Sequence, residues 1–155
     1  MIPTFRDDPS ALLKALDERG VDAEIVLLDD GGGDADLTRR MAGRIEKLGL
    51  PARLIVLSPN EGRAKGRNRL ARHARGRHLL FLDSDMLPDR PDFLQVWLDL
   101  IAAENPAVAF GGFSLKQAPR DRRFAVHRAL SGASECVRAA QRAKTPEKYV
   151  YTSNL

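Results

Sequence analysis

The sequence predicts an α/β protein with a mostly parallel sheet that carries helices on both faces. The first observation is an alternation, along the 155 residues, of short apolar runs with longer segments of helical periodicity. The second is that the apolar runs are continuous, which is typical of strands in a parallel sheet covered on both sides. Strands joined through helices in this way place those helices on either face of the sheet.

The expected strands are the continuous apolar runs. They cover residues 23–30, 52–58, 78–85 and 107–114. An earlier strand is nearly absent, since only Met1 and Ile2 precede the segment "PTFRDD". The last eight residues, "KYVYTSNL", are expected to begin another strand, and the stretch from Lys116 to that point is expected to be helical in parts.

Four helices are expected between and after these runs. The first begins at Asp8-Pro9, where an aspartate can cap the helix and a proline fits the first turn, and it ends before Gly20. The second ends before Gly49, the third covers residues 61–75, and the fourth runs from about residue 89 to Asn105. Their inward-facing residues are expected to be Leu12, Leu13 and Leu16; Leu37, Met41, Ile45 and Leu48; Ala64, Ala71 and Ala74; and Phe93, Leu94, Trp97, Leu98 and Ile101.

Composition indicates one folded domain over residues 1–155. Hydrophobic residues make up 43% and charged residues 30%, as in ordinary globular domains. The single cysteine, Cys136, excludes an intrachain disulfide. The net charge of +4 favours an anionic partner. No apolar run approaches the roughly 20 residues of a membrane helix, so we expect a cytoplasmic protein that could lie at a membrane surface in its full-length form.

The segment "HLLFLDSDMLP" ends an apolar run with Asp83 and Asp85. Ligands of open parallel sheets gather at the carboxyl ends of the strands. If strand geometry continues through these residues, both carboxylates face one side and repel each other unless a cation lies between them. Carboxylate oxygens suit Mg²⁺ or Mn²⁺, with positions left for phosphate and water. The alternative is that both acids cap a turn before Met86.

Two other acidic pairs receive different interpretations. Asp34 and Asp36 precede an apolar helical stripe, so helix N-capping explains them better than ligand binding. Asp29 and Asp30 follow an apolar run and precede three glycines, which allow a backbone to approach a ligand closely. These acids could accept hydrogen bonds from a base or a ribose, or they could belong to a solvated loop.

The segment from Arg63 to Arg77 holds seven basic residues. Such density can contact nucleic-acid phosphates, but no aromatic residue interleaves, and we expect no nucleic-acid partner. The narrower alternative is phosphate binding near the helix start by the Gly62 N–H, Lys65 or Arg67. The remaining arginines of the segment, from Arg69 onward, are expected on an exposed face. The three histidines show no metal-ligand spacing.

Four segments in order, "IPTFRDD", "LLDDGGGDADL", "NEGRAKGRN" and "LLFLDSDMLP", resemble the nucleotide-sugar-binding half of family 2 glycosyltransferases with the GT-A, Rossmann-like fold. The resemblance covers residues 1–113. It implies that the chain binds a nucleoside-diphosphate sugar, with a UDP-sugar favoured, through Mn²⁺ or Mg²⁺ and transfers the sugar to a hydroxyl of a carbohydrate or lipid-linked acceptor. The residues implicated in substrate binding are Pro3, Thr4, Arg6, Asp30, Gly62, Lys65, Arg67 and Asp83, and those implicated in metal binding are Asp83 and Asp85.

This sequence departs from the family pattern at two points. Gly32 stands where the family usually has serine. The catalytic base of inverting members lies beyond the Asp-x-Asp, and neither Glu135 nor Glu147 belongs to a motif that identifies it. We therefore expect a truncated donor-binding core that binds nucleotide and metal but transfers sugar poorly.

Two other classes remain open at this stage. A Toprim-like metal-dependent nucleic-acid enzyme also uses Asp-x-Asp after a strand, but it needs a glutamate at an earlier strand end. The only nearby glutamate, Glu24, begins its strand instead. A non-catalytic nucleotide-binding domain is the third interpretation.

Overall fold

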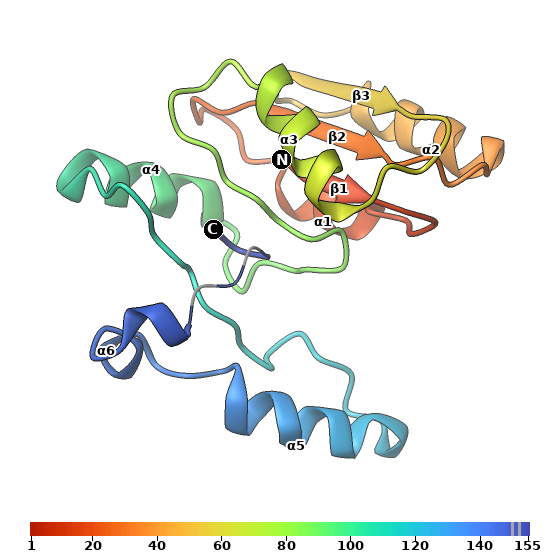
Figure 1. The fold of residues 1–155 in the computed structure, drawn as a ribbon. Helices are drawn as coiled ribbons and strands as arrows, with labels where there is room; N and C mark the ends of the chain where they lie inside the picture. Colours follow the sequence, from red (N-terminus) through yellow and green to blue (C-terminus); the bar gives the residue numbers. More distant parts are fainter. Residues whose placement is uncertain (150, 152) are drawn as a thin grey trace.

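The computed structural model describes residues 1–149, 151 and 153–155, and a parallel sheet forms its centre (Figure 1). The sheet has three strands, β1 (Ile2–Thr4), β2 (Ile25–Asp29) and β3 (Ala52–Val56), in the order β1-β2-β3. Ile2 lies opposite Leu27 in the first pair. The α/β class with a parallel sheet is therefore confirmed. Strand β1 continues to Thr4, two residues beyond the Met1 and Ile2 that the sequence indicated.

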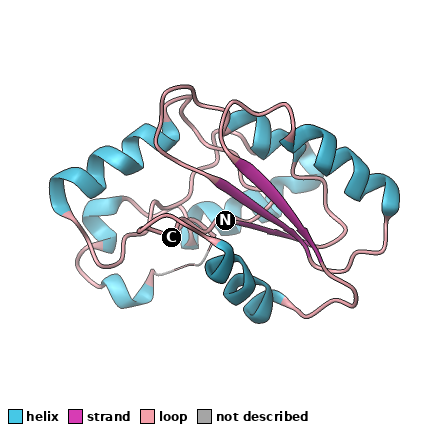
Figure 2. Cartoon of the chain, turned by 90° about the horizontal axis from the view of Figure 1, so that it is seen from above, coloured by secondary structure: helices cyan, strands magenta, loops and turns pink. Residues whose placement is uncertain are grey.

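Helices surround and extend this sheet (Figure 2). Helices α1 and α2 cover one face of β2, and α3 covers the other. Both faces of the sheet are thus occupied, as the continuous apolar runs predicted. The helices are α1 (Ser10–Ala15), α2 (Ala35–Ile45), α3 (Arg63–His73), α4 (Phe93–Glu104), α5 (Ala125–Ser134) and α6 (Ala139–Arg142), with short 3₁₀ turns η1 (Arg122–Phe124) and η2 (Pro146–Lys148).

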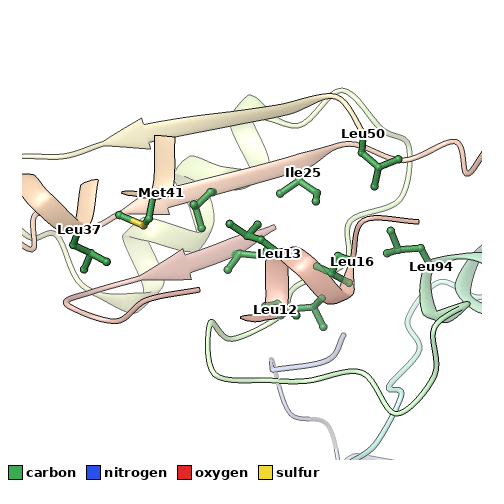
Figure 3. Packing of buried hydrophobic residues seen from close by; sticks show 11 residues of the cluster. Leu12, Leu13, Leu16, Ile25, Leu37, Met41, Leu50 and Leu94 are labelled. Atoms are coloured by element: carbon green, nitrogen blue, oxygen red, sulfur yellow. The ribbon is translucent and has the colours of Figure 1, made fainter. Parts of the chain in front are cut away.

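The core is built around β2, whose five residues are all buried. Successive side chains of a strand point to opposite faces. Ile25 and Leu27 accordingly join the cluster that contains residues of α1 and α2, in which Figure 3 labels Ile25. Leu28 instead joins Leu70 of α3. The larger cluster also takes in Leu94 of α4. Burial on both faces explains why the first four residues of β2 are apolar, and the polar Asp29 follows only at its carboxyl end.

The helix boundaries follow local capping chemistry. Asp34 accepts hydrogen bonds from the backbone N–H groups of Asp36 (3.0 Å) and Leu37 (2.9 Å), which confirms the N-capping interpretation of this acidic pair. Helix α1 ends at Ala15 and so stops well before Gly20, although Gly20 does adopt a left-handed φ of 79°. Helix α4 ends at Glu104, before Asn105, as expected. The backbone of Asn105 lies in the left-handed region.

Helix α3 packs on the sheet mainly through Gly66 and Leu70, and of the three alanines predicted to face inward Ala71 and Ala74 are half-buried. Ala64 is exposed, and Gly66 and Leu70 are buried instead. A Cβ at Gly66 would lie 2.9 Å from Cδ2 of Leu28. The close approach of α3 to β2 therefore requires a glycine, and this approach turns the helix so that Ala64 faces solvent.

The predictions of strands at residues 78–85 and 107–114 are wrong. In the first segment only Leu82 forms a bridge, an antiparallel one with Asn154. In the second, the Gly111 N–H donates to the Asn154 carbonyl (3.1 Å). Residues 153–155 thus lie between the two segments, and these few residues do not provide a continuous ladder. Of the expected last strand, residues 150 and 152 lie outside the described residues.

Segment 80–83 still lies beside β1, because the Leu82 N–H donates to the Met1 carbonyl (3.0 Å). It therefore holds the sheet position of a fourth strand without the regular pairing. This position brings Asp83 to the same edge as the end of β1. Across the part of the chain that is described, no helix is both long and apolar enough to cross a bilayer.

Candidate active site

A cavity of about 250 Å³ opens at the carboxyl ends of β1 and β2. The predicted residues that it brings together are Pro3, Thr4, Asp30, Asp83 and Asp85. The residues that complete its wall are Phe5, Asp7, Arg63, Gly66 and Ser84. Four predicted residues, Arg6, Gly62, Lys65 and Arg67, stand outside this wall. The cavity therefore lies at the carboxyl ends of the strands, but only part of the predicted site residues face it.

Asp83 is the hydrogen-bonding centre of the cavity. Its Oδ1 accepts from the guanidinium of Arg67 at 2.5 Å, and its Oδ2 accepts from that of Arg63 at 3.0 Å. The hydroxyl of Ser153 also donates to Oδ2, at 2.7 Å. Two guanidinium groups thus share the single carboxylate of Asp83. Asp83 therefore positions two arginines beside the cavity.

Asp85 differs from Asp83 in its exposure and in its hydrogen bonds. The chain makes a turn here, with the Met86 N–H donating to the Asp83 carbonyl at 3.1 Å. The expectation that strand geometry places both carboxylates side by side is therefore wrong, although both still line the cavity. The Asp85 side chain is exposed, and among the described residues no hydrogen bond or ion pair is recorded for its carboxylate.

Asp30 anchors the loop before α3 from beneath the cavity. It is 5% exposed, and its carboxylate accepts the backbone N–H groups of Glu61 and Gly62, each at 2.9 Å. The Gly62 N–H, predicted to bind phosphate, thus already has an acceptor. A phosphate could take this group only by exchange with Asp30. The loop is further held by Asn60, whose amide donates to the Asp30 carbonyl at 2.7 Å.

The loop after β1 is tied to the turn at Asp83. The Thr4 hydroxyl donates to the Asp7 carbonyl (2.7 Å), and the Ser84 hydroxyl donates to the Asp7 carboxylate (2.7 Å). Thr4 is buried at the end of β1. Hydrogen bonds from these two hydroxyls therefore hold the loop after β1 against the turn at Asp83, and Asp7 accepts both of them.

Arg6 lies on the rim, above the glycine loop. It has a left-handed φ of 56°, and its Nε donates to the Gly32 carbonyl at 3.3 Å. Gly32 in turn donates its N–H to the Asp29 carboxylate at 3.1 Å, and a Cβ at Gly32 would lie 3.2 Å from that oxygen. The glycine at this position thus fits a tight contact between the loop and the end of β2.

A second, larger hollow of about 500 Å³ lies on the other side of the glycine loop. It runs between the start of α2 and the end of β3, and Asp29 lies at its inner end. The Asp29 carboxylate is occupied, because its second oxygen accepts the Thr38 hydroxyl at 2.6 Å. We place the candidate site at the smaller cavity, whose wall contains Arg63, Asp83 and Asp85.

The basic residues of α3 divide into two groups. Arg63 and Arg67 contact Asp83, while Arg69 donates to the Glu61 carboxylate from Nε and Nη2 at 2.5 Å each. The hydrogen bond from Arg69 lowers the pKa of the Glu61 carboxyl below its usual value. Lys65 points away from the cavity wall and is exposed. Exposure was correctly predicted for Arg72, Arg75 and Arg77, but Arg69 is half-buried.

Glu24 does not serve the Toprim-like interpretation. It precedes β2 at the amino end of the strand, and its carboxylate accepts hydrogen bonds from the Arg53 guanidinium (2.6 Å) and from the Arg75 N–H (2.5 Å). A metal site of that class needs this acid at the opposite edge of the sheet, near Asp83. Glu24 therefore does not supply the catalytic glutamate that the nucleic-acid alternative needs.

The donor chemistry of the cavity fits one hard divalent ion. Within the described residues, no cluster of three or more histidine, cysteine or acidic side chains could enclose a metal. Mg²⁺ and Mn²⁺ do not need such a cluster, since they bind one or two carboxylates and take water and substrate phosphates as further ligands. Asp85 is the carboxylate whose oxygens have no recorded partner, whereas Asp83 already accepts three hydrogen bonds.

Several wall residues escaped the sequence prediction. Asp7, Arg63 and Ser84 lie inside the quoted motifs, so their positions next to predicted residues could have indicated them. Ser153 had no such signal, because it reaches Asp83 from 70 residues away. The late carboxylates Glu135 and Glu147 do not line the cavity.

Comparison with known proteins gives the family. The family model described as glycosyl transferase family 2 matches residues 1–153. A curated relative from Bacillus subtilis (strain 168), named "Putative teichuronic acid biosynthesis glycosyltransferase TuaG", is 32% identical over 100 residues. That match covers 64% of this chain and 38% of the relative, so the chain spans well under half of the relative's length.

A solved structure shares the fold. It is the mannosyltransferase PcManGT from Pyrobaculum calidifontis in complex with GDP-Man and Mn²⁺, with a TM-score of 0.54 and 24% sequence identity. The superposition covers 66% of this chain and 31% of that one. At this identity the likeness supports the GT-A-type arrangement of the sheet and helices.

Proposed function

Because the chain belongs to glycosyl transferase family 2, we propose that its cavity binds the diphosphate of a nucleoside-diphosphate sugar together with a divalent ion. The observation that carries the proposal is the pairing of opposite charges in one cavity. Asp85 offers a carboxylate without a recorded partner, and Arg63 and Arg67 present positive charge from the Asp83 side. A metal–diphosphate complex needs both kinds of group.

The two arginines suit different tasks. The Arg67 side chain is 12% exposed and is held against Asp83, so it supplies a fixed positive charge. The Arg63 side chain is 73% exposed and can turn toward a bound phosphate without loss of packing. Fixed charge costs no reorganisation when negative charge develops on a leaving group. Asp83 is thus a positioning residue that orients both guanidinium groups.

The metal would be held by Asp85. When bound, Mg²⁺ or Mn²⁺ supplies Lewis-acid stabilisation of the departing nucleoside diphosphate. Pro3, Thr4 and Asp30 form the part of the wall nearest the ends of β1 and β2, and we assign the nucleoside to them. A UDP-sugar remains the favoured donor, and the GDP-Man of the solved relative makes a guanosine donor the competing choice.

For the whole protein we propose transfer of the sugar to a hydroxyl of a carbohydrate or lipid-linked acceptor. The described residues contribute the donor side of that reaction. The acids of the cavity wall are Asp7, Asp30, Asp83 and Asp85, and three of these already accept hydrogen bonds from neighbouring groups. We therefore assign donor binding, and no catalytic base, to the part of the chain described.

Calorimetric titration of UDP and GDP into the purified chain, with and without Mn²⁺, tests the proposal. We expect Asp85→Asn to weaken binding in Mn²⁺ by about 10- to 100-fold and to leave the metal-free affinity unchanged. Asp22→Asn is the matched control, because Asp22 is exposed and lies before β2, away from the cavity. Equal metal dependence in wild type and Asp85→Asn would contradict the assignment of the metal to this residue.

A second pair of variants tests which basic residues meet the diphosphate. Arg63 lines the cavity, whereas Lys65 lies two residues further along α3 and outside it. We expect Arg63→Gln to weaken nucleotide binding and Lys65→Gln to leave it unchanged. If Lys65→Gln weakened binding and Arg63→Gln did not, the phosphate would bind on the face of α3 that carries Lys65, as the sequence suggested.

A further inference from the structure

The positive charge of the chain is concentrated in the segment around α5 and α6. Residues 116–144 contain eight Lys or Arg residues and two acids, a net charge of +6. The whole chain has a net charge of +4, so the remaining residues together carry −2. The excess of basic residues is therefore local, and it lies outside the sheet and outside the cavity of the candidate site.

The same segment exposes large apolar side chains. Val126 is 74% exposed and Leu130 is 64% exposed. They stand four residues apart and so share one face of α5. Phe124, just before the helix, is 43% exposed. In Figure 1, α5 lies at the edge of the molecule farthest from the sheet.

The opposite face of α5 contacts the rest of the protein. Ser131 is buried, and a Cβ at Gly132 would lie 3.3 Å from the Leu115 side chain. The Arg128 guanidinium donates to the Ala118 carbonyl at 2.9 Å. The helix is thus attached through one side, and its apolar stripe faces outward by construction.

Arginines flank the apolar stripe at its amino end. Arg120 and Arg122 are exposed, and within the described residues no ion pair is recorded for either. Arg123 is neutralised locally by Asp121, at 2.7 Å. A short helix with an outward apolar stripe and unneutralised arginines beside it has the chemistry of an interfacial helix, which inserts apolar side chains between lipids while its cations meet anionic headgroups.

We propose that the outward face of α5, formed by Phe124, Val126 and Leu130 with Arg120 and Arg122, docks on an anionic phospholipid surface. Charge complementarity favours lipid headgroups, because an apolar stripe alone would suit any hydrophobic partner, but the exposed Arg120 and Arg122 beside it specify an anionic one. Docking through α5 leaves the donor cavity free, because none of these residues lines it.

Co-sedimentation with vesicles tests this proposal without nucleotide, so its result is independent of donor binding. We expect the 155-residue chain to bind vesicles of phosphatidylcholine mixed with phosphatidylglycerol, to ignore pure phosphatidylcholine, and to dissociate as salt is raised. Arg120→Gln with Arg122→Gln should weaken binding by roughly tenfold or more. Val126→Ser with Leu130→Ser should weaken it by a similar factor, because the apolar stripe would no longer insert.

Matched controls separate a docking face from general attraction. Arg72→Gln with Arg77→Gln removes the same charge from exposed positions in and after α3, and Val108→Ser removes an equally exposed apolar side chain outside α5. Both controls should bind vesicles as wild type does. The proposal is overturned if the two arginine pairs weaken binding equally, if neutral vesicles bind as well as anionic ones, or if no vesicles bind. It is also overturned if the α5 variants change self-association instead of vesicle binding, because α5 would then serve a second copy of the chain.

Discussion

The sheet body, residues 1–104, and the outer segment, residues 107–149, contain similar fractions of apolar residues. They differ in whether those side chains are buried or exposed. Every buried hydrophobic side chain that the structure describes lies in the sheet body, from Ile2 to Leu94. The outer segment instead exposes Val108, Val126 and Leu130 by 64% or more. An apolar residue is buried only when a second layer of structure lies against it. The body has that second layer on both faces, and the outer segment has contacts on one side.

The largest expected difference is in the cost of removing a leucine from each region. Leu27→Ala should lower the free energy of unfolding by about 3 kcal/mol, because the side chain is fully buried and its loss leaves a cavity. Leu130→Ala should change it by less than about 0.5 kcal/mol, since the side chain is mostly exposed. Urea unfolding of both variants measures the contrast. Equal losses would show that α5 is packed against something in solution.

A pair of glycines in the left-handed region sharpens the comparison. Gly31 in the body has φ 71°, and a Cβ there would meet the Asn60 backbone nitrogen at 2.4 Å. Gly112 in the outer segment has φ 83°, but a Cβ there meets only the tip of the Arg142 side chain, at 2.5 Å. Alanine in place of either glycine costs about 1–2 kcal/mol of backbone strain.

Because backbone cannot move aside as a side chain can, Gly31→Ala should lose clearly more stability than Gly112→Ala, and thermal unfolding would rank them. If the two melting temperatures fell equally, the contact between the glycine loop and the loop before α3 would not be as close as described.

Capping carboxylates form the third contrast. Asp30→Asn should lower stability by about 2 kcal/mol, because the amide can accept only one of the two buried N–H groups that Asp30 holds. Asp121→Asn, which alters an exposed capping bond to the Arg123 N–H, should cost clearly less than Asp30→Asn. Hydrogen exchange at Gly62 would report the first change directly, and unaltered protection there would argue against the bond.

The smallest expected effect is a pH dependence. Burial raises the pKa of Glu24, but hydrogen bonds from the Arg75 N–H and from Arg53 outweigh it, so the pKa lies below its ordinary value of 4.5. A depressed carboxyl pKa stabilises the fold above pH 4.5, and this contribution is lost as the pH falls through the folded pKa. The stability difference between wild type and Glu24→Gln should therefore shrink on acidification below pH 4.5.

Asp121 provides the comparison for this titration. Its pKa is also lowered, by the hydrogen bond from the Arg123 side chain. Because Asp121 is exposed, solvent screens the interaction. The stability difference between wild type and Asp121→Asn should therefore not change measurably with pH over the same range. Unfolding curves at several pH values for both variants would separate the two cases, and a constant Glu24→Gln difference below pH 4.5 would contradict the assigned linkage.

The sequence by itself determined the class of the fold, the cap of α2 and the edge of the sheet at which the acidic motif residues lie. The predicted N-cap of α1 at Asp8 was wrong by one residue, because Pro9 occupies the N-cap position and makes no side-chain capping bond. Continuous apolar runs identified β2, because a strand covered on both faces has no exposed position for a polar side chain, and they also identified β3, which is only half-buried. Asp34 identified the start of α2 through bonds to residues two and three positions away. The placement of Asp30 and Asp83 at one edge followed from strand ends. All of these are local patterns, or consequences of a parallel sheet.

Only the tertiary structure decided which apolar runs became strands and which polar groups stayed available. Residues 78–85 and 107–114 have strand-like sequences, but strand pairing depends on a partner from elsewhere in the chain, here on residues 153–155. In the same way, Asp83 and Asp85 are equivalent in sequence. Asp83 is occupied because α3 brings Arg63 and Arg67 to it, while Asp85 lies past the turn and beyond their reach. Contacts between distant residues made that distinction, and no spacing within the motif contains it.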